Sequence, residues 1–389
     1  MNQFTAPSYP TVPASAASAA ASRNVLRWAV ATVLIFAALL AGLLTVWMIG
    51  YETGFVPFLA GLIAAVIPVP VYVTLVLWLD RYEPEPKWML ATAFFWGALV
   101  AVFFAIIINS LGVLVVRSLS DEGTARLFGM VFSAPVVEET SKALVLFALF
   151  LWKRDEFDGV TDGIVYAAMV GLGFAMTENV KYYGEAVLEH NAIGVFIVRG
   201  LFSPFAHPLF TGMTGVGLGL AAQSDRKLVK FVAPVFGFIA AMLFHSGWNA
   251  SAYLTGHFEN GAFVLLTYFL VMMPTFLGML VVIVLSLRRE GRILREQLRA
   301  DVSTGLLSES EYLCVCSVFG RMSASCSAFT RGGFGLWRAR VQLNRAASEL
   351  AFHRLRVARG INPRGTTNAE REQTYVRQIY DLRLLLERK

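Results

Sequence analysis

Charged residues are scarce in this sequence of 389 residues, and their scarcity excludes an ordinary soluble protein. Asp, Glu, Lys and Arg make up only 15% of the chain, whereas 56% of its residues are hydrophobic. A soluble globular domain is about a quarter charged. We therefore expect an all-α integral membrane protein, in which every charge inside an apolar run needs an explanation.

Cysteine is scarce as well, which excludes a disulfide framework. Cys314, Cys316 and Cys326 all lie near the C-terminal end, in a region that the loop charges described below assign to the cytoplasm. An odd number of cysteines there indicates free thiols. Nucleic-acid-binding motifs are missing too, so no nucleic-acid partner is expected.

The chain divides by composition into three parts. Residues 1–22 are rich in Ala, Ser and Pro and carry no charge, which predicts a disordered leader. Residues 23–287 hold the long apolar runs, and residues 288–389 carry 19 Lys and Arg against 10 Asp and Glu. This basic tail contains amphipathic helical patterns and suits the anionic inner leaflet of a membrane.

The central part predicts a bundle of about eight transmembrane helices, since a span needs about 20 mostly apolar residues. The sixth span contains the sequence SPFAHP (Ser203 to Pro208), which predicts a kink. The expected spans are 25–49, 55–79, 88–116, 127–152, 159–180, 192–222, 228–254 and 262–287.

Basic residues in the short loops predict the orientation. One set of loops carries most of them, including Lys153 and Arg154, whereas the other set carries only Arg117, Arg126 and Lys181. We therefore expect a multi-pass protein of the cell membrane with both termini in the cytoplasm.

The fourth span carries ionisable groups at its centre, within the sequence EETSK. Glu138 and Lys142 are four residues apart and Glu139 and Lys142 three apart, so the lysine can pair with either carboxylate across one helical turn. Each ionisable group at bilayer depth costs about 2.5–3.5 kcal/mol. One lysine does not neutralise two glutamates, so the second requires a proton, a cation or a donor on another helix. A purely structural ion-pair cluster is the alternative interpretation.

Three other spans contribute polar groups that can meet these glutamates. The fifth contains Glu178 and Asn179, the sixth contains His207 beside its prolines, and the seventh places His245 and Asn249 on one helical face. A carboxylate can act as general base on water, with imidazoles as oxyanion donors.

Metal catalysis is the alternative, because three N or O ligands with an open water position are typical of a catalytic zinc site. A divalent metal such as zinc would then be held by Glu178, His207 and His245. The HExxH helix of many zinc proteases is missing.

At these residues the sequence resembles the PrsW family of intramembrane proteases, within a broader group of CAAX-protease-like membrane proteins. The resemblance rests on EETSK (Glu138 to Lys142), GFAMTEN ending in Asn179, FAHPLFTG around His207 and HSGWN (His245 to Asn249). A cytoplasmic segment, LDRYEPEPKW from Leu79 to Trp88, is also similar to the family.

The resemblance implies a membrane-embedded endopeptidase that cuts a single-span membrane protein, in the family's best-known role an anti-sigma factor. Glu138 and Glu139 would be catalytic, and Glu178, His207 and His245 would complete the site, with Asn249 orienting and Lys142 and Asn179 supporting it. Both a metal and a glutamate-activated water remain open. A transporter or channel that uses these groups as a cation or proton path is the competing hypothesis, although no internal repeat supports it.

Overall fold

The computed structural model describes residues 14–154, 156–360 and 367–387. They form helices joined by short connections, with no strand among them, as the composition predicts. The spanning part consists of α1 (Ala14–Thr53), α2 (Phe55–Val66), α3 (Val69–Leu79), α4 (Lys87–Phe95), η1 (Trp96–Ala101), α5 (Val102–Leu119), α6 (Glu122–Leu127), η2 (Phe128–Ser133), α7 (Ala134–Trp152), α8 (Val160–Leu188), α9 (Ala192–Phe196), η3 (Ile197–Phe202), α10 (Ala206–Gln223), α11 (Lys227–Phe258), α12 (Ala262–Thr267), η4 (Tyr268–Met272) and α13 (Met273–Ser303), where η marks a π-helical turn. The tail adds α14 (Glu309–Val315), α15 (Val318–Ala358) and α16 (Asn368–Glu387).

Seven stretches of helix among the described residues are long and apolar enough to cross a membrane. The predicted fourth span is not among them, and it carries three charged residues, Glu138, Glu139 and Lys142, in its middle. It is nevertheless helical from Glu122 to Trp152 and packs in the bundle between α5, α8, α10 and α11. Helices α14 and α15 are together long and apolar enough for one further span, but they are bent by 113° against each other and belong to the tail.

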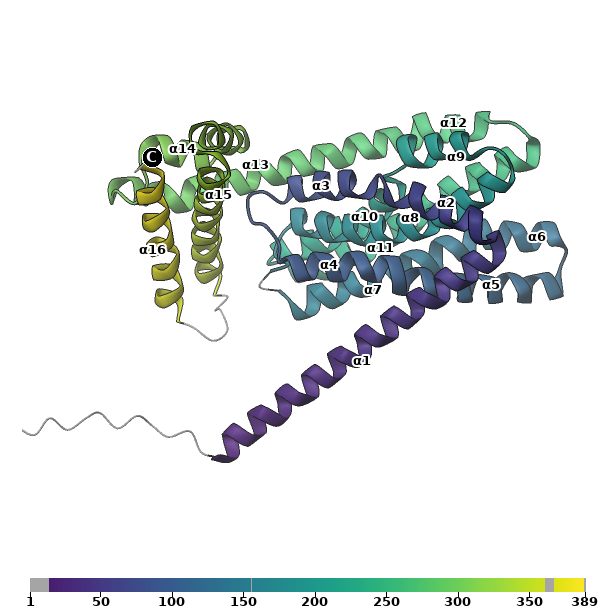
Figure 1. Ribbon diagram of the computed structural model, residues 1–389, viewed down its shortest axis with the longest axis horizontal. Helices are drawn as coiled ribbons and strands as arrows, with labels where there is room; N and C mark the ends of the chain where they lie inside the picture. The colour runs from purple at the N-terminus through teal and green to yellow at the C-terminus, as the bar shows by residue number, and fades with distance from the viewer. Residues whose placement is uncertain (1–13, 155, 361–366, 388–389) are drawn as a thin grey trace, which may run out of the picture.

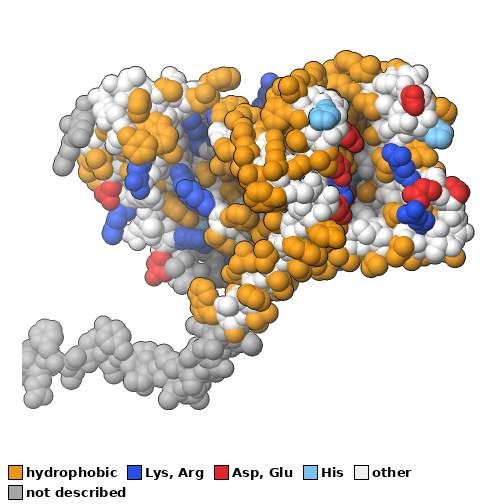
Figure 2. All heavy atoms as spheres, turned by 45° about the vertical axis from the view of Figure 1, so that its right-hand side comes forward, with side chains coloured by type: hydrophobic (Ala, Val, Ile, Leu, Met, Phe, Trp, Pro, Cys, Tyr) orange, Lys and Arg blue, Asp and Glu red, His pale blue; other side chains and the backbone are white. Residues whose placement is uncertain are grey.

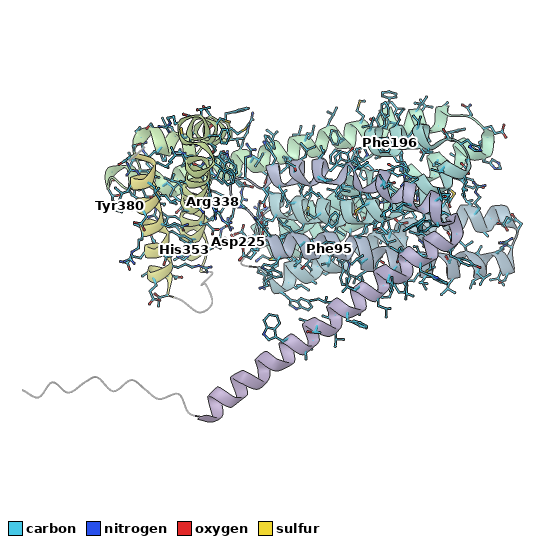
Figure 3. The ribbon with its side chains drawn as sticks, in the orientation of Figure 1. Phe95, Phe196, Asp225, Arg338, His353 and Tyr380 are labelled. Carbon is cyan, nitrogen blue, oxygen red and sulfur yellow. The ribbon has the colours of Figure 1, made fainter. Side chains whose placement is uncertain are left out.

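Successive spans run in alternate directions, so the bundle has two ends (Figure 1). The end that faces the tail, here called the tail end, holds the loop 80–86, the loop 153–159 and Asp225 (Figure 3). Hydrophobic side chains cover most of the bundle surface (Figure 2). Both features are those of a multi-pass membrane protein.

Helix α8 is the centre of the bundle and is almost completely covered by its neighbours. Its backbone touches that of α10, since a Cβ atom added at Gly163 would lie 2.1 Å from the Gly215 carbonyl oxygen, and one at Gly171 would lie 2.6 Å from the Pro208 nitrogen. Small residues allow such close contact between membrane helices. The contact brings the Glu178 helix against the His207 helix.

The sixth span is interrupted where its prolines predict a break in the helix. The π-helical turn η3 ends at Phe202, and α10 begins at Ala206 after an interruption at 203–205. Pro208 then lies in the first turn of α10, where a missing N–H is tolerated. This break places His207 at the start of a helix inside the membrane.

The leader prediction needs one correction. Residues 1–13 lie outside the described residues, but α1 begins at Ala14, so residues 14–22 are helical rather than disordered. Alanine has the highest helix propensity, and this segment is rich in it.

The tail forms a compact unit around Leu294, Leu298 and Leu343, against which Tyr82 of the loop 80–86 is buried. Helix α13 runs across residue 288 without a break. The change of composition at that residue therefore lies inside one helix.

Candidate active site

The glutamate pair on α7 is buried around Lys142. The lysine Nζ lies 3.3 Å from Glu138 Oε2 and 2.9 Å from Glu139 Oε1, and 3.7 Å from the centre of the Phe174 ring. The Lys142 side chain is fully buried. The pairing predicted from the sequence spacing is confirmed, and it takes in both carboxylates.

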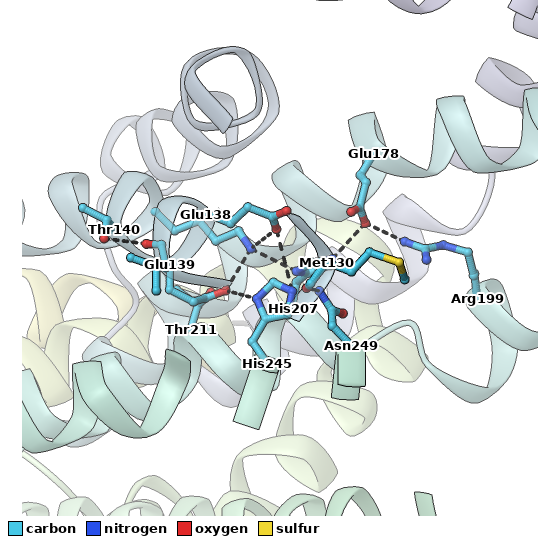
Figure 4. A network of polar contacts seen from close by, with 12 residues as sticks. Met130, Glu138, Glu139, Thr140, Glu178, Arg199, His207, Thr211, His245 and Asn249 are labelled. Atoms are coloured by element: carbon cyan, nitrogen blue, oxygen red, sulfur yellow. Dashed lines mark hydrogen bonds and ion pairs between the residues drawn. The ribbon is translucent and has the colours of Figure 1, made fainter. Parts of the chain in front are cut away.

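Glu139 is occupied on both of its oxygens. Oε1 accepts from Lys142 and lies 3.0 Å from His245 Nδ1, while Thr211 Oγ1 donates to Oε2 at 2.9 Å (Figure 4). An ionised carboxylate only accepts, so the imidazole donates from Nδ1. His245 also stacks on Phe210, with 4.9 Å between ring centres. Glu139 therefore fixes the orientation of His245.

His207 is held by a second carboxylate, Glu178. Lys142 Nζ lies 2.9 Å from His207 Nδ1, and since an ammonium only donates, that nitrogen is the acceptor. His207 Nε2 then donates to Glu178 Oε2 at 2.9 Å. Arg199 in turn lies 2.5 Å from Glu178 Oε2 through Nη2 and donates to Asn179 Oδ1 through Nε at 2.6 Å.

Each histidine thus has one nitrogen on a carboxylate and the other turned towards the middle of the cluster. The inward nitrogens are His207 Nδ1, which faces Lys142, and His245 Nε2, which lies 3.9 Å from Glu138 Oε2. Carboxylate contacts of this kind orient the histidine ligands of metal sites.

Glu138, His207 and His245 could hold a metal ion, because each offers a donor atom within 4.8 Å of the others. Two imidazoles and a carboxylate form a donor set suited to zinc, and an adjoining cavity leaves space for water. The residues present fit such an ion. The sequence prediction differs in one member, since it placed Glu178 in the set, whereas the three residues with donor atoms this close together include Glu138 instead. A metal ion there would replace the Lys142 ammonium as the partner of His207 Nδ1.

A cavity of about 690 Å³ reaches this cluster. Its lining extends to the turn between α5 and α6, which lies at the end of the bundle opposite the tail (Figure 1). Glu138, Glu178 and His207 line it, whereas Glu139, Lys142 and His245 lie behind its wall. Charged side chains gather at a recess in the otherwise hydrophobic surface (Figure 2). The cavity is lined in its outer part by Arg117, Glu122 and Arg126.

Asn249 also lines the cavity, and its contact differs from the expected one. Its Nδ2 donates to the Met130 carbonyl oxygen at 2.9 Å, and Ser246 Oγ donates to the Val131 carbonyl at 2.5 Å. Both acceptors belong to the π-helical turn η2, a kind of turn that often marks functional sites. Asn249 therefore joins α11 to the start of the α7 helix.

The structure brings every predicted site residue into one connected region, and it adds two that the sequence analysis missed. Arg199 is a single charge in an apolar run of the sequence. Its role was missed because the sequence does not show that it lies beside Glu178. Thr211 lies in the segment FAHPLFTG, but nothing in the sequence indicated that it binds Glu139. The four-residue step from His207 to Thr211 on α10 explains its place beside the cluster.

A membrane bundle with buried glutamates, two oriented histidines and a cavity that reaches them has the groups that an intramembrane hydrolase requires. Residues 85–279 match the family model of the PrsW family of intramembrane metalloproteases. The chain belongs to this family and is an intramembrane protease.

Individual members of the family are also similar to this chain in sequence. The chain is 34% identical over 162 residues to Protease PrsW of Geobacillus kaustophilus, covering 40% of this chain and 67% of the relative. It is 31% identical over 171 residues to Protease PrsW of Bacillus subtilis, covering 44% of this chain and 72% of the relative. No matching solved structure was found.

Proposed function

We propose that the cavity hydrolyses a peptide bond of a membrane-anchored protein, and that Glu138 is the residue on which the chemistry depends. The observation that carries the proposal is the difference between the two neighbouring glutamates. Glu138 lines the cavity, whereas Glu139 is 1% exposed and has partners on both oxygens. A group that acts on substrate water must reach the cavity.

Glu138 serves in either of the two mechanisms that the sequence leaves open. Without a metal, its carboxylate takes a proton from the attacking water. A divalent ion such as zinc, when held by Glu138, His207 and His245, would supply Lewis-acid activation of that water. In both cases Glu139 and Glu178 orient the histidines, and Lys142 compensates the charge of the carboxylates.

The cavity suits a peptide that enters from within or beside the bilayer. Its volume lies in the range of small-ligand sites, and Val113 and Leu114 line it together with the polar groups. We propose a single-span membrane protein as the substrate, with an anti-sigma factor as the class that the family resemblance suggests. Basic loops at the tail end support a cytoplasmic position for both termini.

A buried hydrophobic cluster argues against the competing transporter hypothesis. Val145, Leu146, Leu149 and Tyr166 pack closely between the glutamates and the tail end. A conduit that runs along α7 and α8 would have to cross this cluster. An ion path from one end of the described bundle to the other is therefore not favoured.

The test is incubation of the purified full-length protein with candidate single-span proteins in liposomes, together with analysis of bound metal. We expect cleavage by the wild type and none by Glu138→Ala. Glu189→Ala, at the exposed end of α8, is the control and should cut normally. Ion flux that depends on Glu138 in the absence of any cleavage would refute the proposal.

A further inference from the structure

The first part of α15, residues 318–332, presents an apolar stripe to the outside. Successive members are three, four and three residues apart, which puts them on one side of the helix. Phe319 is 80% exposed and Phe329 54% exposed. The stripe consists of Phe319, Met322, Cys326 and Phe329. A contiguous exposed apolar face of this kind marks a surface that binds something.

Another side of the same helix contacts the ends of the membrane spans. Arg321 is buried there and donates to the Arg81 carbonyl oxygen at 2.8 Å, with its guanidinium 4.6 Å from the centre of the Tyr82 ring. Arg81 follows the span that ends at Leu79, and its own guanidinium lies 3.9 Å from the Trp78 ring centre. Trp and Arg gather where a span meets the lipid headgroups. The contact therefore holds α15 near headgroup level.

The stretch of sequence that holds the stripe carries charges of one sign. From Tyr312 to Ser348 the chain contains no Asp or Glu. The arginines of this stretch are Arg321, Arg331, Arg338, Arg340 and Arg345. Arg331 and Arg338 are exposed, and Figure 3 shows Arg338 in the tail beyond the ends of the spanning helices. Aromatic side chains next to arginines, without carboxylates, complement an anionic lipid surface.

A break in α15 after this segment separates its direction from that of the rest of the helix. Gly332 and Gly333 leave the helical conformation, and Gly333 has a φ of 64°, a region that favours glycine. The exposed Phe334 follows directly. The segment 318–332 is thus a separate short helix, anchored on one side by Arg321 and open on the other.

We propose that residues 318–332 form an interfacial helix that lies in the headgroup region of the leaflet at the tail end. Phe319, Met322 and Phe329 enter the acyl boundary, and Arg331 and Arg338 bind anionic headgroups. This membrane contact goes beyond the protease function and does not depend on it.

The test uses the native Cys326 as a reporter in the full-length protein, reconstituted in nanodiscs of phosphatidylcholine with or without phosphatidylglycerol. Cys314→Ser removes the half-buried thiol, while Cys316 is buried. A polarity-sensitive fluorophore on Cys326 should emit at shorter wavelength and be quenched by lipids that carry a nitroxide high on the acyl chain. Phosphatidylglycerol should strengthen the quenching.

The matched control places the same fluorophore on the exposed face of α16, in Cys314→Ser/Cys326→Ser/Gln378→Cys, and should show little lipid quenching. Phe319→Ser with Phe329→Ser should abolish the quenching at Cys326, and Phe319→Leu with Phe329→Leu should retain it. Equal quenching at positions 326 and 378 would overturn the proposal. Shielding of Cys326 from aqueous iodide without lipid quenching would overturn it too, since a protein would then cover the stripe.

Discussion

Replacement of Lys142 by methionine tests the charge balance of the buried cluster. Methionine keeps an unbranched apolar stem but removes the ammonium that lies 3.3 Å from Glu138 and 2.9 Å from Glu139. Removing one partner of a buried ion pair costs about 3–5 kcal/mol, because the remaining charge is left uncompensated. We expect a loss of unfolding free energy of that size. Lys181→Met is the control, since Lys181 pairs with Glu52 at 2.6 Å but is 40% exposed; exposed pairs contribute about 0–1 kcal/mol.

The measurement is reversible unfolding in mixed micelles with increasing SDS, followed by helical circular dichroism. The double variant Lys142→Met/Glu139→Gln should lose less than the sum of its single variants, because neutral glutamine no longer needs the cation; couplings between contacting groups are about 0.5–3 kcal/mol. A Lys142→Met loss no larger than that of Lys181→Met would refute the reasoning. Strict additivity of the double variant would refute it as well.

Three further predictions follow from individual contacts. Arg199→Met and Glu178→Gln should each reduce cleavage and stability, and the double variant should lose less than their sum in a double-mutant cycle, because the two side chains form one pair. Burial raises the pKa of the Cys316 thiol to about 11, so maleimide at pH 8 should label the exposed Cys326 far faster, as peptide mass spectrometry would show; equal rates would contradict this. Tyr82→Ala should cost about 3–5 kcal/mol in the tail unit and speed its digestion by trypsin, since the ring is 3% exposed in that core.

The spans were largely predictable because every helix that crosses the hydrocarbon core must be long enough and apolar enough to do so. Length and apolarity locate each helix, and the kink before His207 follows from its two prolines. Helix α7 was predicted as a span because the residues on both sides of its charges are apolar, although Glu138, Glu139 and Lys142 distinguish it from the seven more typical spans. The helix at residues 14–22 was missed because low charge and many alanines were interpreted as disorder.

The residues of the candidate site and the Lys142 pairs within α7 were predictable from the sequence, but the contacts between different helices were not. Glu138 and Glu139 are adjacent, and only the packing of α7 against α10 and α11 decides which of them reaches the cavity. The contact between Glu178 and His207 depends on the close approach of α8 and α10 at their glycines. Such contacts between distant parts of the chain leave no local pattern in the sequence.

The most direct test of the account is the rate at which purified full-length protein in liposomes cuts a single-span substrate, compared between Glu138→Gln and Glu185→Gln. Both variants lose one carboxylate, but Glu185 is 43% exposed at the end of α8, whereas Glu138 faces the cavity. We expect the rate to fall about 10²–10⁴-fold in Glu138→Gln, the usual effect of losing a general base, and to stay near the wild-type rate in Glu185→Gln. Cleavage by Glu138→Gln at the wild-type rate would contradict it.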